Sequence, residues 1–381
     1  MTLTEEQRAV AGLARDIAAG EIAPHIAAWD RARTFPRDLI ATLGQAGLLG
    51  LLIPEAYGGS AAGYVSYALT IEEIARVDAG TATTLSVHSM VASAIAKLGD
   101  AEQCARWLPA LASGAALAGF GLTEPDAGSD AAAIRARAER DGDDYIVNGR
   151  KQWCTNGGYA AVVMAMFRTG GAGARGISAF LVDTALPGVS VERETDKLGI
   201  HTSNTVDLAF ENVRVPAGAR IGSEESGLTS ALATLAAGRI GIAAQATGIL
   251  TACLDASVKF ARERVAFGRP IGAFEGIAFK IARMATDLEA ARLLTYRAAE
   301  LCDAGEPFTI AASKAKFFAS TAARTHAAEA VQIHGGYGYT TEFPVERYYR
   351  DAKITEIYEG TSEIQQLIIA RDLIGRLDEG R

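Results

Sequence analysis

A glutamate stands in an apolar and aromatic setting near the end of the 381-residue sequence. Glu359 follows Ile357 and Tyr358, and Gly360 comes directly after it. A carboxylate that loses water in such surroundings has a raised pKa, which suits it to remove protons near neutrality. These residue types therefore indicate a general base. The same stretch also matches an ordinary helix start with Thr361 or a neighbouring serine as the cap.

Two stretches have residue types that suit a flat ligand. The segment 120–130 combines small residues, two hydroxyl groups and a proline turn, so its backbone N–H groups can approach a ligand closely, although an ordinary turn has the same composition. The segment 151–157 places Trp153 two residues before Thr155, and on a strand these side chains share a face. The pair can lie against a planar ligand, or Trp153 can pack at a domain interface.

Two further stretches lie in the second half of the chain. Arg262–Pro270 is rich in arginine, and its guanidinium groups can bind a phosphate through paired hydrogen bonds or simply solvate a helix end. Gln332–Gly336 is followed by Tyr337 and Gly338, so three glycines fall within four positions. A helix C-cap explains one of them. The other two indicate a close approach of the backbone to a partner.

Several common motifs are excluded. Gly171–Gly176 matches GxGxxG, but the dinucleotide fingerprint requires a strand before it and a helix after it. Strand-like residues lie on both sides, so we expect a hairpin tip. The five histidines and four cysteines are scattered without metal-ligand spacing, and no metal site is expected. The cysteines are predicted to be buried, reduced thiols. They are Cys104, Cys154, Cys253 and Cys302.

Composition limits the class of protein. With 37 Lys and Arg against 45 Asp and Glu, the net charge is −8, which argues against nucleic-acid binding. The 49% of hydrophobic and 22% of charged residues exclude a mostly disordered chain. We expect no membrane span, because no apolar run reaches about 18 residues. The acidic start is typical of neither a signal nor a transit peptide, so a cytoplasmic protein is expected. Thr4 and Gln7 form a predicted capping box.

Three segments with different residue patterns must position these residues. Residues 1–118 have helical patterns, and residues 226–381 contain long helical stretches with short connections, which predict an antiparallel bundle. Residues 119–225 instead carry short runs of β-branched and aromatic residues, with Asp141-Gly142 as a hairpin signal. They predict a small antiparallel β domain. Its expected strands are Ile134–Arg140, Tyr145–Trp153, Val162–Thr169, Ile177–Val182 and Val206–Phe210.

In this order, the five stretches resemble the acyl-CoA dehydrogenase family of flavoproteins, over nearly the whole chain. The resemblance implies a mostly α fold: an N-terminal helical domain, a middle β-barrel-like domain and a C-terminal four-helix bundle. FAD is then expected between the β domain and the bundle. A neighbouring subunit completes its site, so a homo-oligomer is implied, either a dimer or a dimer of dimers (a homotetramer).

The resemblance also assigns roles to residues. Thr155 is expected near the flavin N5 edge, and Arg264 with four other residues is expected at the ADP half of the FAD held by the other subunit. The implied cofactor-binding residues are Phe120, Leu122, Thr123, Gly128, Ser129, Trp153, Thr155, Arg264, Phe267, Gln332, Gly335, Gly336, Thr361 and Glu363. The implied substrate-binding residues are Ser129, Arg239, Tyr358 and Gly360.

Glu359 matches the catalytic base of the family. One branch carries that carboxylate on the long helix beside the residue matching Arg239, where this chain has Gly238. The resemblance implies that Glu359 removes the proton α to the thioester carbonyl while hydride leaves the β carbon for flavin N5. The backbone N–H of Glu359 and a ribityl hydroxyl would bind the carbonyl oxygen. The product is a trans-2-enoyl thioester, and electrons pass to an electron-transfer flavoprotein in fatty-acid or amino-acid catabolism.

Three residues depart from the usual family pattern. Ala236 replaces an acidic residue near the channel arginine, Glu275 replaces a glutamine, and Ser226 stands where glycine is common. The first change leaves open an acyl group on a carrier protein in place of free CoA. An oxidase of the same fold matches the motifs equally well, whereas a non-enzymatic scaffold is less favoured. His88 can hydrogen-bond a polar acyl tail, but a packed histidine is favoured.

Overall fold

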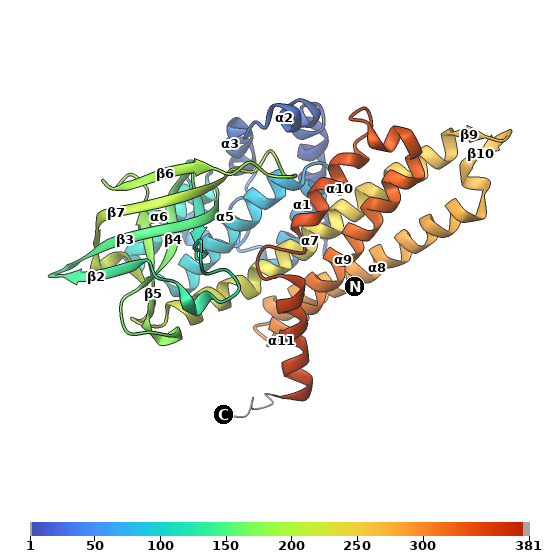
Figure 1. The fold of residues 1–381 in the computed structure, drawn as a ribbon. Coiled ribbons are helices and arrows are strands. Elements are labelled where there is room, and N and C mark those ends of the chain that lie inside the picture. Colours follow the sequence, from blue (N-terminus) through green and yellow to red (C-terminus); the bar gives the residue numbers. More distant parts are fainter. Residues whose placement is uncertain (1, 376–381) are drawn as a thin grey trace.

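The computed structural model describes residues 2–375 (Figure 1). The chain begins with helices that lie beside the sheet and the C-terminal bundle. Their starts follow local capping chemistry: Thr4 and Gln7 form the predicted capping box, and Asp78 and Asp100 cap later helices. The helices are α1 (Glu5–Ile17), α2 (Ile26–Ala32), α3 (Arg37–Gln45), α4 (Gly63–Ala75), α5 (Ala79–Leu98) and α6 (Ala101–Ala112).

A β sheet follows the first helices. Its strands are ordered β6-β7-β3-β2-β4-β5-β8, and β1 pairs with β4. The sheet is mixed, because β1 runs parallel to β4 while most other neighbours are antiparallel. The strands are β1 (Leu117–Gly121), β2 (Arg137–Asp141), β3 (Asp144–Thr155), β4 (Ala160–Arg168), β5 (Ile177–Asp183), β6 (Val189–Glu194), β7 (Thr205–Pro216) and β8 (Arg220–Ile221).

The five predicted strands are present as β2, β3, β4, β5 and β7, whereas β1, β6 and β8 were not predicted. Strand β2 begins at Arg137 rather than Ile134, because a short 3-10 turn precedes it, and β7 continues to Pro216 rather than ending at Phe210. Strand β6 was not predicted, since it lies at the sheet edge with mostly exposed, charged residues and lacks a hydrophobic pattern. The hairpin at Asp141-Gly142 is confirmed. So is the hairpin tip at Gly171–Gly176, which connects antiparallel β4 and β5.

The rest of the described chain is helical. Helices α7, α8 and α9 are long and pack on one another, and the shorter α10 and α11 pack against α9. Residues 376–381 of the expected third segment lie outside the described residues. A short hairpin, β9 (Val265–Ala266) and β10 (Arg269–Pro270), connects α7 to α8. The helices are α7 (Gly227–Glu263), α8 (Glu275–Asp303), α9 (Thr309–His334), α10 (Val345–Ile354) and α11 (Ser362–Ile374).

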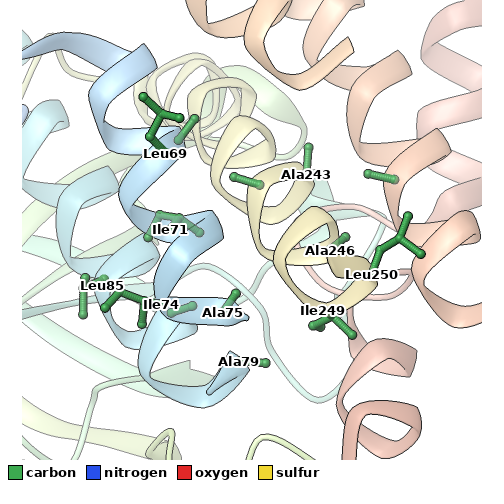
Figure 2. Close-up of a cluster of buried hydrophobic side chains, with 14 of the residues drawn as sticks. Leu69, Ile71, Ile74, Ala75, Ala79, Leu85, Ala243, Ala246, Ile249 and Leu250 are labelled. Atoms are coloured by element: carbon green, nitrogen blue, oxygen red, sulfur yellow. The ribbon is translucent and has the colours of Figure 1, made fainter. Parts of the chain in front are cut away.

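Helix α7 joins the two halves of the molecule. It runs from the sheet to the β9–β10 end, and its glycines let α4 pack closely against it: a Cβ on Gly248 would lie 2.4 Å from the Glu72 carbonyl oxygen. Figure 2 shows α7, with Ala243 and Ala246, beside α4, with Ile71 and Ile74. By length and composition α7 is apolar enough to cross a membrane, but 78% of its most apolar window is buried inside the fold. That burial is typical of a core helix.

Candidate active site

Glu359 lies in a tight turn between α10 and α11. Glu359 and Gly360 both have left-handed backbone conformations, with φ of 52° and 93°. This conformation is uncommon for a residue with a side chain, so surrounding contacts must hold it. The carbonyl oxygen of Gly360 accepts hydrogen bonds from Lys316 Nζ at 2.7 Å and from Gln365 Nε2 at 2.8 Å. Hydrogen bonds from α9 and α11 therefore hold the turn in place.

The Glu359 carboxylate faces α7. A Cβ added to Gly238 would lie 2.2 Å from Glu359 Oε2, so the carboxylate packs directly on the helix backbone. Both carboxylate oxygens are buried, and neither has a hydrogen-bond partner within residues 2–375. Burial raises the pKa of Glu359 to about 7, while the charges of Lys316 and Arg239 act in the opposite direction. Such a carboxylate can accept and release a proton near neutrality.

Helices α4 and α5 contact the same face of α7. A Cβ on Gly241 would lie 2.1 Å from the Tyr67 hydroxyl oxygen and 2.5 Å from Ser86 Oγ, and one on Gly238 would lie 2.6 Å from Met90 Sδ. Sequence reasoning missed Tyr67, Ser86 and Met90. The available signal was the three-residue spacing of Gly238 and Gly241, which places two glycines on one helix face.

Two cationic side chains lie near the carboxylate. Arg239 is 4% exposed, its Nη1 donates to Ser313 Oγ at 3.3 Å, and its Nε has no partner within the described chain. Lys316 is completely buried. Sequence reasoning missed Lys316, although its position on the alanine-rich stripe of α9, four residues after Ala312, marks it as an inward-facing charge.

Hydrogen bonds connect Tyr358 to neighbouring helices. Its hydroxyl donates to Gln245 Oε1 and lies 3.4 Å from Thr83 Oγ1. Gln245 Nε2 in turn donates to the Ala79 carbonyl at 2.8 Å and to Thr83 Oγ1 at 2.7 Å. The hydroxyl of Tyr358 thus anchors the residue before Glu359 to α5 and α7, and its predicted contact with substrate stays a prediction.

A bulge in β3 decides which face of the strand Trp153 occupies, and the sequence did not show it. The pairing of β3 with β7 shifts between Lys151 and Cys154, and Trp153 has a φ of 57°. This bulge reverses the alternation, so Lys151 and Cys154 are buried whereas Trp153 is 56% exposed. Without the bulge, Trp153 would share the buried face of Lys151.

The loop after β1 is held by a buried ion pair. Lys151 Nζ lies 2.7 Å from Glu124 Oε1, and the Glu124 carboxylate also accepts from the backbone N–H groups of Arg135 and Ala136. Sequence reasoning missed this pair. Around it, Phe120 and Thr123 are half-buried, and Gly128 and Ser129 are exposed. The Leu122 side chain is buried in the core, so its predicted contact with FAD is left to its backbone and stays a prediction.

The predicted residues for the ADP half of FAD gather at the far end of the bundle (Figure 1). Arg264 caps α7, 26 residues after Gly238, about 39 Å along an α-helix. Its guanidinium carbon lies 5.4 Å from the ring centroid of Tyr337, and Phe267 is 95% exposed. The structure brings this group together but keeps it away from Glu359 of the same chain. The group consists of Arg264, Phe267, Gln332, Gly335 and Gly336.

The remaining predicted residues have clear positions. Thr361 caps α11, since its Oγ1 accepts from the Ile364 N–H at 3.4 Å, and Glu363 is exposed in the first turn of that helix. His88 is a packed histidine, as favoured from sequence: it is fully buried, its Nδ1 accepts from the Ala118 N–H at 3.4 Å, and burial lowers its pKa to about 4. The four cysteines form no disulfide, and three are buried as predicted, but Cys302 is half-buried.

The residues present fit FAD as a long, flat, phosphate-bearing cofactor. Trp153 presents an exposed ring, although tryptophans are highly buried on average. At Gly335 and Gly336 an added Cβ would meet no atom within 4 Å, so the backbone there is open to a ligand. The exposed Arg264 nearby can bind a phosphate through paired hydrogen bonds. These features suit the flavin ring and the nucleotide end respectively.

Comparisons with known proteins agree along the whole chain. Family models match the N-terminal domain of acyl-CoA dehydrogenase at residues 4–115, the middle domain at 119–213 and the C-terminal domain at 225–374. An acyl-CoA dehydrogenase of Bacillus subtilis (strain 168) is 48% identical, over 98% of this chain and 100% of that protein.

Two solved structures have nearly the same fold. Butyryl-CoA dehydrogenase from Megasphaera elsdenii has a TM-score of 0.97 and 42% identity, over 98% of this chain and 99% of that one. A chain from a structure of the electron transferring flavoprotein of Acidaminococcus fermentans has a TM-score of 0.97 and 43% identity, over 99% of this chain and 100% of that one. With all three domain models matched in order, the chain belongs to the acyl-CoA dehydrogenase family of FAD-dependent oxidoreductases.

Proposed function

We propose that Glu359 is the base with which this FAD-dependent acyl-CoA dehydrogenase takes a proton from the carbon α to the thioester carbonyl. The supporting observation is a buried carboxylate without a hydrogen-bond partner among the described residues, whose pKa burial raises to about 7. The proton moves to a Glu359 carboxylate oxygen, and the electron pair of the broken C–H bond forms the new double bond. When bound, FAD supplies at N5 the acceptor for the hydride that leaves carbon β.

The developing enolate needs hydrogen bonds at the carbonyl oxygen. The backbone N–H of Glu359 is available for this purpose, since it donates no hydrogen bond within the described chain. The left-handed turn at Glu359 and Gly360 holds that N–H and the carboxylate in one rigid unit. The base and the donor for the oxyanion thus come from the same residue, and the product is the trans-2-enoyl thioester.

The cofactor contacts divide between two copies of the chain. Trp153 and Thr155 would flank the isoalloxazine, with the loop from Phe120 to Ser129 and the start of α11 at Thr361 and Glu363 alongside. Because the group around Arg264 lies about 39 Å along α7 from Gly238, it would serve the FAD of a partner copy. This requires a homo-oligomer, a dimer or a dimer of dimers, built from the three domains expected from sequence.

We assign a short straight-chain acyl-CoA as the substrate. The bulky Met90 and Tyr67 pack tightly on Gly238 and Gly241 beside the Glu359 carboxylate, which restricts the space for an acyl tail. The solved butyryl-CoA dehydrogenase, at 42% identity, points the same way. Arg239, Ser129, Tyr358 and Gly360 keep their predicted roles along the thioester channel.

The electron acceptor and the location are further parts of the proposal. The 43%-identical chain in the electron transferring flavoprotein structure supports such a flavoprotein as the acceptor. We keep the cytoplasmic location that the sequence led us to expect.

Anaerobic titration of the purified yellow protein tests the function. Butyryl-CoA should bleach the flavin absorbance, and longer and dicarboxylic acyl-CoAs should bleach it more slowly, whereas the Glu359→Gln variant should bind FAD and stay yellow. Bleaching that persists in Glu359→Gln would disprove the base. A protein that no acyl-CoA bleaches would point to a carrier-bound substrate, and fast reoxidation by dioxygen would identify an oxidase.

A further inference from the structure

Lys316 is the one lysine on the buried stripe of α9. It is 0% exposed, and the small residues around it on that face (Ala312, Ala315, Ala319) are 0% exposed as well. Taking an ammonium group out of water is costly unless it is paired and hydrogen-bonded. Its hydrogen-bond acceptor is the Gly360 carbonyl, 2.7 Å from Nζ. A charge in this position therefore calls for a functional explanation.

The acceptor belongs to the residue that follows Glu359. Glu359 and Gly360 both have positive φ, and the Gly360 carbonyl is a point at which hydrogen bonds hold this unusual turn. Gln365 Nε2 also donates to the Gly360 carbonyl, at 2.8 Å, but it is neutral. Lys316 thus contributes two separable effects: a hydrogen bond that fixes the turn, and a positive charge that favours the ionised form of the Glu359 carboxylate.

We propose that Lys316 is a positioning residue for the base, which holds the Glu359–Gly360 turn through the Gly360 carbonyl and keeps the carboxylate of Glu359 ionised by its charge. The inference rests on the proposed function of Glu359. Lys316 acts on the reaction through Glu359.

Charged and polar groups on several elements act on Glu359 and Lys316. The positive charges of Arg239 on α7 and of Lys316 both lower the pKa of Glu359, and the hydroxyls of Tyr67 on α4 and of Tyr358 interact with the carboxylate in their neutral form. Burial lowers the pKa of Lys316 to about 8, while Glu359, Glu356 and Glu363 raise it and Arg239 lowers it. Of the two cations that lower the pKa of Glu359, Lys316 has the larger effect.

Three variants separate charge from hydrogen bond. Lys316→Gln keeps a donor but removes the charge, Lys316→Met removes both, and Gln365→Leu removes only a neutral donor. Two quantities are measured on each holoenzyme: the pH midpoint of single-turnover flavin reduction, and the Glu359 carboxyl titration by infrared difference against Glu359→Gln, without substrate. Lys314→Gln, an exposed lysine two residues away on α9, is the matched control.

Both Lys316 variants should shift the rate midpoint and the infrared titration of Glu359 to higher pH by about one unit. On the acidic side, flavin reduction should therefore be about tenfold slower. Lys316→Met should also lower the high-pH plateau rate. Gln365→Leu should lower the plateau without moving the midpoint, and Lys314→Gln should match the wild type.

An unchanged midpoint in a folded, yellow Lys316→Gln protein would overturn the inference. If the Lys316 variants do not fold, Gln365→Leu decides: a midpoint shift there would show that loosening of the turn alone, not the Lys316 charge, sets the titration. Failure of the proposed function is distinct, because it would appear in the wild type as absent bleaching or as bleaching that survives in Glu359→Gln.

Discussion

Gly238 and Glu359 are in direct contact, although 121 positions separate them in the chain. A Cβ on Gly238 would lie 2.2 Å from Glu359 Oε2 and 2.6 Å from Met90 Sδ. The helix that carries Gly238 therefore forms one wall of the site, and the lack of a side chain there leaves the carboxylate its space.

A methyl group at position 238 should disturb this contact. Gly238→Ala is expected to displace the Glu359 carboxylate, lower the rate of flavin reduction more than tenfold and destabilise the fold by about 1–3 kcal/mol through overpacking. Gly276→Ala on α8, where a Cβ meets nothing within 4 Å, is the matched control and should leave both unchanged or raise stability slightly. Stopped-flow reduction and thermal melting measure the two effects. Equal behaviour of the two variants would contradict the contact.

The raised pKa of Glu359 predicts how activity depends on pH. The carboxylate must be ionised to accept the α-proton, so single-turnover flavin reduction should slow as the pH falls through about 7. Glu359→Asp, a shorter carboxylate, should retain a pH-dependent rate at a much lower level. A rate that stays constant from pH 8 to pH 5 would show that another group takes the proton.

The same pKa has a consequence for stability. The folded protein holds the Glu359 proton up to about pH 7, whereas the unfolded chain releases it near 4.5, so folding binds a proton between these values. The contribution of Glu359 to stability is therefore fully present below about pH 4.5 and is lost as the pH rises to 7. Glu359→Gln should melt at a higher temperature than the wild type at pH 8, and the difference should shrink at pH 5. Calorimetry at both pH values checks this, and the opposite trend would refute the raised pKa.

The exposed ring of Trp153 should matter for FAD rather than for the fold. Trp153→Ala is expected to weaken FAD binding about tenfold or more through lost stacking, while the melting temperature of the apoprotein changes little. Trp107, which is 9% exposed in the core, is the contrast: Trp107→Ala should cost about 3–5 kcal/mol of stability. Fluorescence of the released flavin measures the effect on FAD binding and distinguishes it from the effect on stability. Unchanged FAD affinity in Trp153→Ala would remove this residue from the site.

A mixing experiment tests whether two chains share one FAD site. Arg264→Ala and Trp153→Ala should each bind FAD weakly and be poorly active at limiting FAD. When they are co-refolded they should regain activity, because a mixed dimer contains one site with both native residues. With random pairing in a two-fold dimer, about a quarter of all sites are restored. Recovery of no activity from two folded variants would indicate that Arg264 does not reach the FAD of a partner.

Much of the site was predictable because its chemistry is local. Glu359 beside Gly360, the pairing of Trp153 with Thr155 and the capping by Thr361 depend on residues close in sequence, and helical and strand periodicity placed them on the correct elements. The edge strand β6 was missed because its residues are mostly exposed and carry no hydrophobic pattern. The bulge at Trp153 was also missed, since the backbone geometry that creates it leaves no periodic signal.

By itself, the sequence determined the order of helical, β and helical segments and the candidate base, because both follow from spacing and residue type. Only the tertiary structure decided what surrounds that base. Lys316, Gly238 and Arg239 come from other helices, and their effect on Glu359 depends on burial and distance, which act through space. The same holds for the separation of Arg264 from Glu359: a single long, rigid helix keeps the two ends of the molecule apart.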